Sequence, residues 1–306
     1  MALALTAALV LSAAVAAAQQ PTPLFRTSAN VVRVDALVTS RGKPIADLTA
    51  SDFELYDNGV RQEVTLASIE DLDVDVVLAL DSSRSVRGSL LQTLREAAAA
   101  LVRGLRPGDR AAVVAFSNGV RILTPLTDDH TLVSRALEQV EARGGTSLVD
   151  ATWASILLAH GNDRPTLLLV FSDGADTSSW LRVPPVLALA TRANLVADAV
   201  VVGSARLLAA ARRAPAAPPS GEPIAFADTG VEDFLVDLTR TTGGKVVDGG
   251  GGSRLASVFA QALREFRTRY QLSYTPTGVD RPGWHAIEVR VNRPNATIRA
   301  RLGYTQ

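Results

Sequence analysis

The chain has 306 residues, and its 31 Lys and Arg balance 31 Asp and Glu. A hydrophobic fraction of 47% and a charged fraction of 20% are typical of a globular protein with a sizeable core, arranged as two domains or as one large domain with an appendage. Zero net charge disfavours nucleic acid or an anionic membrane as the main partner, because both attract basic surfaces. The absence of Cys excludes disulfides, thiolate catalysis and zinc ribbons.

The N-terminal segment predicts export. Residues 2–18 are uncharged and apolar, about the length of a signal-peptide core and short for a membrane span of ~20 residues. Ala16 and Ala18 form an A-x-A cleavage site before Gln19. Because no basic residue precedes the apolar run, an uncleaved anchor is the alternative. We therefore expect residues 1–18 to be a signal peptide, and the protein to be periplasmic or secreted without membrane insertion after cleavage.

The next segment predicts strands without helices. Partial hydrophobic alternation indicates strands at residues 31–38, 52–56 and 61–69. The sequence Asp57-Asn58-Gly59 between the last two is a strong signal for a tight turn. Residues 25–73 are therefore expected to form part of a small β-module.

From residue 74 the pattern changes to alternating strands and helices. Residues 74–80 and 166–171 are almost continuously apolar, as in strands that are buried on both faces of a parallel sheet. Further strands are predicted at 111–116, 120–123, 196–202 and 245–247, and helices at 90–105, 131–142, 148–159, 185–193, 231–241 and 254–267. The pattern predicts a doubly wound, mostly parallel six-stranded α/β sheet over residues 74–267. The Ala- and Pro-rich stretch 209–221 is expected to be an exposed loop.

Helices cease again after residue 267. Strands are predicted at 270–274, 285–291 and 296–302. Together, residues 25–73 and 268–306 are able to form one small β-sandwich into which the α/β unit is inserted, or which flanks it. Sequence order alone leaves the pairing of the two groups open.

Polar motifs follow the two most apolar strands of the predicted sheet. A D-x-S-x-S pattern, Asp81 to Ser85, follows the first, and Ser172-Asp173-Gly174 follows the second. Between them, Gly144-Gly145-Thr146-Ser147 begins a helix. Open α/β sheets bind ligands beyond the carboxyl ends of their strands, where the strand order reverses, so we expect these side chains to converge there. Such an all-oxygen set suits a hard divalent cation, and two carboxylates leave that cation able to attract a further carboxylate from another molecule.

Each motif is weak when taken singly, because Asp and Ser are common at turns and helix N-termini. Their joint occurrence after two buried strands, with Gly-Gly-Thr between them, is what favours a metal site. Trp153 and Trp180 lie near the motifs in sequence and could flank the site, but core packing is the expected role of both.

These motifs give residues 74–267 a resemblance to the von Willebrand factor type A domain, which is also the inserted domain of integrins. The metal-ion-dependent adhesion site (MIDAS) of that family uses D-x-S-x-S, a Thr and an Asp on three loops. The matching residues here are Asp81, Ser83, Ser85, Thr146 and Asp173. The resemblance implies that the hydroxyls bind the cation directly, that the two Asp act largely through waters, and that an Asp or Glu of a protein partner completes the coordination. It implies Mg²⁺, with Mn²⁺ or Ca²⁺ as alternatives.

The flanks add to this resemblance. The stretches LTASDFELYDNG, RYQLSYTP and RLGY resemble the flanks of exported bacterial proteins of the same group. The sequence therefore predicts a protein-binding module that is not an enzyme. One alternative is a hydrolase that uses the same Asp and Ser cluster, although a Ser nucleophile needs a base such as His, and none is near in sequence. The other is a structural protein with a metal-free α/β insert.

Overall fold

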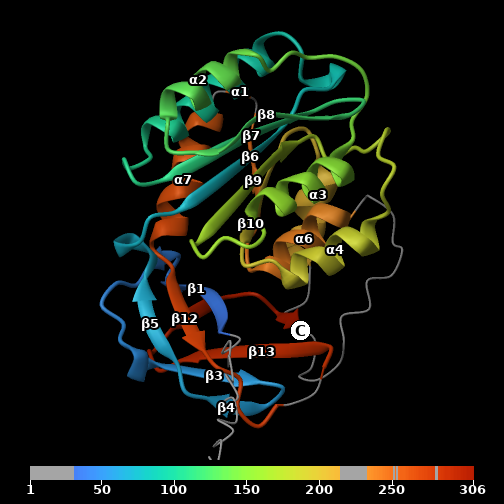
Figure 1. Ribbon diagram of the computed structural model, residues 1–306. Helices are drawn as coiled ribbons and strands as arrows, with labels where there is room; N and C mark the ends of the chain where they lie inside the picture. The colour runs from blue at the N-terminus through green and yellow to red at the C-terminus, as the bar shows by residue number, and fades with distance from the viewer. Residues whose placement is uncertain (1–30, 214–232, 251, 253, 280–281) are drawn as a thin grey trace, which may run out of the picture.

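The computed structural model describes residues 31–213, 233–250, 252, 254–279 and 282–306. It shows an α/β unit standing over two antiparallel sheets (Figure 1). Residues 1–18, the predicted signal peptide, lie outside the described residues. Within the described ranges, no helix has both the length and the apolar character that a membrane crossing requires.

The α/β unit is built on a six-stranded sheet, as the sequence predicts. Its strands are β6 (Asp75–Asp81), β7 (Arg110–Phe116), β8 (Val120–Thr127), β9 (Thr166–Ser172), β10 (Val196–Val201) and β11 (Val246–Asp248). They lie in the order β11-β10-β9-β6-β7-β8. All neighbours are parallel except β8, which runs antiparallel to β7.

Helices cover both faces of this sheet, which makes it doubly wound. The helices are α1 (Ser89–Arg103), α2 (His130–Glu138), α3 (Leu148–Ala159), α4 (Val183–Arg192), α5 (Ala205–Arg213), α6 (Phe234–Thr242) and α7 (Leu255–Arg267). Alternate residues of β6 explain the two layers. Leu78 and Leu80 face a core shared with α1, α2 and α7, whereas Val77 and Ala79 face a core shared with α3, α4, α5 and α6. Continuous apolar sequence is what such a strand needs, since both of its faces are buried.

The strands that flank the α/β unit pair with each other and resolve the question that the sequence left open. They are β1 (Val32–Ser40), β2 (Lys43–Pro44), β3 (Phe53–Asp57), β4 (Val60–Gln62), β5 (Thr65–Ser68), β12 (Tyr270–Tyr274), β13 (Trp284–Val291), β14 (Ala296–Arg299) and β15 (Gly303–Thr305). One sheet has the order β14-β1-β12-β5 with β2 beside β1, and the other has the order β15-β13-β3-β4. Because β1 pairs with β12 and β3 with β13, the α/β unit is inserted between the two halves of a β-sandwich.

The two connections between sandwich and α/β unit meet at one buried carboxylate. Asp109, just before β7, accepts a hydrogen bond from the backbone N–H of Val74 at 3.0 Å and pairs with Arg267 at the end of α7. The connecting segments also bond to each other, since the N–H of Ile69 donates to the carbonyl of Arg269 at 3.0 Å. The sandwich therefore lies at the amino-terminal edge of the parallel strands, and their carboxyl-terminal edge faces away from it (Figure 1).

One predicted loop is partly wrong. Residues 205–213 form the helix α5, although 209–221 was expected to be an exposed loop. Ala, Leu and Arg are strong helix formers, and the prolines that suggested a loop begin only at Pro215. Leu207 of α5 is buried in the core on that face of the sheet. Residues 214–221 lie outside the described part of the chain.

Candidate metal centre

The predicted motifs meet where the strand order of the α/β sheet reverses. From β6 the chain crosses to β7 on one side, whereas β9, on the other side of β6, continues to β10. Asp81 is the last residue of β6 and Ser172 the last residue of β9, so their loops leave the same edge side by side. This crevice is the usual ligand site of an open α/β sheet.

The loop after β6 gathers one carboxylate and two hydroxyls. Asp81 is fully buried, and its Oδ1 accepts the backbone N–H of Ser83 at 2.8 Å. Its Oδ2 accepts the hydroxyl of Ser172 at 2.9 Å, which joins the loops after β6 and β9. The hydroxyls of Ser83 and Ser85 lie 2.8 Å apart. The D-x-S-x-S spacing thus places three oxygen-bearing side chains within one turn of chain.

The loop before α3 is hydrogen-bonded to the loop after β6. The N–H of Arg84 donates to the carbonyl of Gly144 at 3.1 Å, and the N–H of Arg143 donates to the carbonyl of Ser82 at 2.8 Å. Gly144 has a φ of +68°, and a Cβ there would collide with the side chain of Asn118. Only glycine combines that conformation with such a close approach, which explains part of the Gly-Gly-Thr motif.

Thr146, at the end of that motif, is buried and held by the loop after β9. Its backbone N–H donates to Thr177 Oγ1 at 3.0 Å. Its carbonyl accepts the N–H groups of Thr177 and Ser178 at 2.8 and 2.9 Å. All three loops are therefore connected by hydrogen bonds around this edge of the sheet.

Asp173 is half-buried at the start of the third loop, and its Oδ1 accepts the N–H of Ala175 at 3.0 Å. Gly174 follows with a φ of +84°, and a Cβ there would collide with Leu207 of α5. The helix that the sequence did not predict therefore packs directly against a loop that carries a predicted ligand.

The electrostatics of the cluster favour a bound cation. Burial raises the pKa of Asp81 to about 6, and the nearby charge of Asp173 adds to the rise, while hydrogen bonds from Ser83 and Ser172 oppose it. A positive charge between two such carboxylates favours their ionised forms.

The donor set fits a hard divalent cation. It consists of two carboxylates and three hydroxyls, and Mg²⁺, Mn²⁺ and Ca²⁺ prefer such oxygen ligands. Within the described ranges, no three or more His, Cys, Asp or Glu side chains gather into a group that could hold a metal, so a cation here depends on the hydroxyls. That Asp81, Ser83, Ser85, Thr146 and Asp173 are the ligands stays a prediction.

Several residues that support the site were not predicted. Ser172 bonds to Asp81, and the Asn118 side chain accepts the N–H of Gly145, although Asn118 was interpreted only as part of a turn. Asp176 and Asp150 hold the loop after β9 against α3. The cluster of Asp, Thr and Ser at 176–179 is the signal that could have indicated such a network.

The expected core packing of both tryptophans is wrong for one of them. Trp153, a residue of α3, is half-buried and packs against the core on that face of the sheet, whereas Trp180 has 93% of its surface exposed. Trp180 lies in the loop between β9 and α4, where neither hydrophobic periodicity nor a regular element directs it inward.

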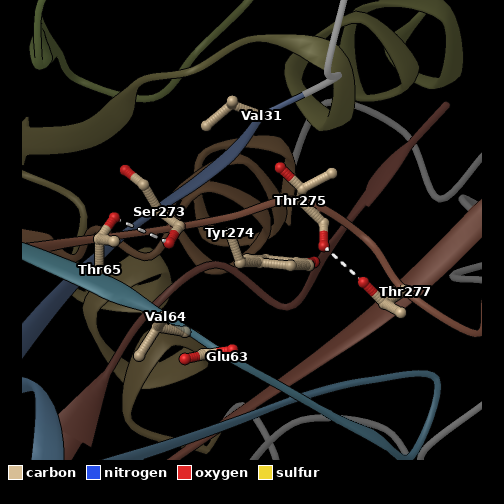
Figure 2. A pocket seen from close by; sticks show the side chains of 8 residues that line it. All are labelled: Val31, Glu63, Val64, Thr65, Ser273, Tyr274, Thr275 and Thr277. Atoms are coloured by element: carbon tan, nitrogen blue, oxygen red, sulfur yellow. Dashed lines mark hydrogen bonds between the residues drawn. The ribbon is translucent and has the colours of Figure 1, made fainter. Parts of the chain in front are cut away.

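The sandwich also contains a hollow. It lies beside β5 and β12, has a volume of about 400 Å³, and includes Glu63, Thr65 and Tyr274 in its lining (Figure 2). Thr65 bonds there to the backbone carbonyl of Ser273 at 3.2 Å. Among the described residues that line the hollow, Glu63 is the one charged residue.

Comparison with known proteins identifies the α/β unit. Residues 76–175 match the family description "von Willebrand factor type A domain". A curated relative, the uncharacterized protein sll0103 of Synechocystis sp., is 30% identical over 107 residues, which cover 34% of this chain and 26% of that protein. The match thus spans about a quarter of the relative's length.

Two solved structures are among those to which this chain is similar. Proximal thread matrix protein 1 from the mussel byssus, with a zinc-occupied MIDAS motif, has a TM-score of 0.51 and 13% identity, over 69% of this chain and 50% of that chain. A von Willebrand factor type A protein from Catenulispora acidiphila has a TM-score of 0.48 and 14% identity, over 92% of this chain and 75% of that chain. The matched residues 76–175 run from β6 past the end of β9 and include all five predicted ligands. Residues 76–175 of the inserted α/β unit thus match the von Willebrand factor type A domain family.

Proposed function

We propose that this protein is an exported module that binds a protein partner through a divalent cation. The cation would be held by Asp81, Ser83, Ser85, Thr146 and Asp173. The observation that carries the proposal is the convergence of three hydrogen-bonded loops, all bearing oxygen donors, at the sheet edge that faces away from the sandwich. With only two carboxylates in the set, the cation keeps positive charge that an Asp or Glu of the partner can neutralise.

Mg²⁺ is the proposed ion, with Mn²⁺ and Ca²⁺ as alternatives. Oxygen donors alone suit these hard cations better than they suit zinc, which favours nitrogen and sulfur ligands. The zinc-occupied MIDAS of the mussel protein supports a metal at this position of the fold. Export is proposed from the uncharged apolar run at 2–18 and its A-x-A site.

The positions of the three His favour binding over hydrolysis. His130 bonds to the carbonyl of Asp109 at the opposite edge of the sheet, at 3.0 Å. His160 follows the far end of α3, and His285 is buried in the sandwich beside Asp57. A Ser nucleophile at the cluster would therefore have no imidazole to take its proton.

Thermal unfolding with Mg²⁺ or with a chelator tests the proposal. Mg²⁺ at about 100 times its Kd should stabilise the wild type by about 2.7 kcal/mol, which raises Tm by several degrees. Asp173→Ala should abolish the rise, because it removes a half-buried ligand from the surface of the site. Asp163→Ala is the matched control, since its carboxylate is exposed and pairs with Arg33 of the sandwich. An equal rise in Asp173→Ala, or none in the wild type, contradicts the metal site.

Turnover of a phosphate or acyl ester that Asp173→Ala abolishes would favour the hydrolase.

A further inference from the structure

Trp180 presents a large apolar surface to solvent close to the candidate metal centre. It has 93% of its surface exposed, and Leu181 beside it is 37% exposed. An exposed tryptophan adds more apolar surface than any other side chain, and tryptophan is enriched among the residues that dominate binding energy in protein interfaces.

The backbone that carries Trp180 is fixed. The carboxylate of Asp150, in the first turn of α3, accepts the N–H of Trp180 at 3.0 Å and that of Leu181 at 2.9 Å. Both oxygens of this carboxylate are therefore used to hold the two residues whose side chains are exposed.

Asp176 fixes the same loop from the other side. Its Oδ1 accepts the N–H groups of Ser178 and Ser179 at 3.2 and 3.0 Å, and its Oδ2 accepts the N–H of Val149 at 2.9 Å. Helix α3 and the loop thus cap each other. Because this backbone is already held in place, an aromatic side chain on it offers contact area with little loss of conformational entropy on binding.

Trp180 lies at the rim of the predicted site. Ser178, two residues before it, donates its backbone N–H to the carbonyl of Thr146. Two residues of chain span at most about 7 Å, so the Cα of Trp180 is within that distance of the Cα of Ser178. A single ligand that binds Trp180 could therefore also reach the metal.

The charges around the site indicate an anionic ligand. Arg84 and Arg87 are exposed in the segment that follows β6, and Arg143 is exposed just before Gly144. In the described part of the chain, none of the three forms a salt bridge with a carboxylate. With a cation bound, this rim is positive and attracts acidic segments.

We infer that the partner is an acidic protein segment with two contacts at this site. One of its carboxylates reaches the metal, and a nearby apolar side chain of the same segment packs on Trp180. The inference rests on the proposed function and adds a second anchor to it. The carboxylate orients the segment at the cation, and the indole supplies desolvated contact area. Specificity then depends on the spacing between an acidic and an apolar residue of the partner.

A displayed library of short random peptides with a fixed central Asp tests the inference. The library is selected on the full chain in Mg²⁺, and single peptides are then measured on variants. We expect enriched peptides to carry an aromatic or aliphatic residue at a constant distance from the Asp. Their affinity should fall about tenfold or more with Trp180→Ala and recover largely with Trp180→Phe. Leu132→Ala is the control, because Leu132 is 47% exposed in the first turn of α2, at the opposite edge of the sheet.

The outcomes separate the two proposals. Peptides that need Mg²⁺ and Asp173 but bind Trp180→Ala as well as the wild type overturn the inference and leave the proposed function intact. Peptides that need Trp180 but tolerate chelator and Asp173→Ala retain the aromatic anchor, but contradict its link to a metal-bound carboxylate. A selection that yields no Trp180-dependent peptide also overturns the inference.

Discussion

Asp81 is a carboxylate that the fold buries at the end of a strand. In the metal-free protein, burial raises its pKa to about 6, above the value of 3.8 that it has when the chain is unfolded. The native state therefore binds a proton at a higher pH than the unfolded state does. The contribution of Asp81 to the free energy of unfolding is lowest when its carboxylate is ionised. This contribution increases as the pH falls through about 6.

The free energy of unfolding of the metal-free protein should show this dependence. Between about pH 7 and pH 5, the wild type should gain about 1 kcal/mol relative to Asp81→Asn, which has no proton to take up. Urea denaturation of both proteins in chelator at the two pH values measures the difference. Parallel changes in the two proteins would show that Asp81 keeps an ordinary pKa in the fold.

At the scale of elements, the position of Thr146 depends on how α3 and the loop after β9 cap each other. Ser147 is the N-cap residue of α3, but its side chain makes no capping bond, and Asp176 from the other loop accepts the N–H of Val149 instead. The next residues of that loop, Thr177 and Ser178, bind the backbone of Thr146. Helix stability and ligand position are thus maintained by the same loop.

Asp176→Ala should therefore have two effects. Loss of the cap should lower the free energy of unfolding by about 1 kcal/mol or more, and Mg²⁺ affinity should fall because the loop that positions Thr146 loosens. Asp129→Ala is the matched control, since Asp129 caps α2 at the opposite edge by accepting the N–H groups of Thr131 and Leu132. It should destabilise by a similar amount and leave Mg²⁺ affinity unchanged. Urea denaturation and calorimetric Mg²⁺ titration distinguish the two; equal Mg²⁺ affinity in both variants would refute the coupling.

At the scale of the whole molecule, the parts that could be predicted are those that local pattern determines. The apolar runs of β6 and β9 predicted the parallel sheet, and the rule for the carboxyl ends of strands placed Asp81 and Asp173 at one edge. The predictions of core packing for Trp180 and of a loop for residues 209–213 are wrong, because the exposure of a loop residue and the docking of a short helix depend on tertiary contacts. The sequence does not predict the pairing of β1 with β12, since strand partners that are far apart in sequence carry no local signal of each other.

Asp109 lies where the two segments of chain that connect the sandwich and the α/β unit meet. Its carboxylate accepts the N–H of Val74, where the chain enters the α/β unit, and pairs with Arg267, where the chain leaves it. It also accepts the N–H of Arg106 at 2.6 Å. Asp109 is fully buried, so its removal would leave the largely buried guanidinium of Arg267 without its counter-charge.

Asp109→Ala should therefore lower the free energy of unfolding by about 3–5 kcal/mol, the usual result of removing one partner of a buried ion pair. Asp163→Ala breaks another link between sandwich and α/β unit, its pair with Arg33, but that carboxylate is 91% exposed. An exposed pair contributes at most about 1 kcal/mol, so this control should change little. Urea denaturation followed by far-UV and near-UV circular dichroism measures both variants. If the two variants lose similar stability, the junction is held by the paired strands of the sandwich and not by the carboxylate. A large loss confined to Asp109→Ala places the link between the two parts at the buried junction.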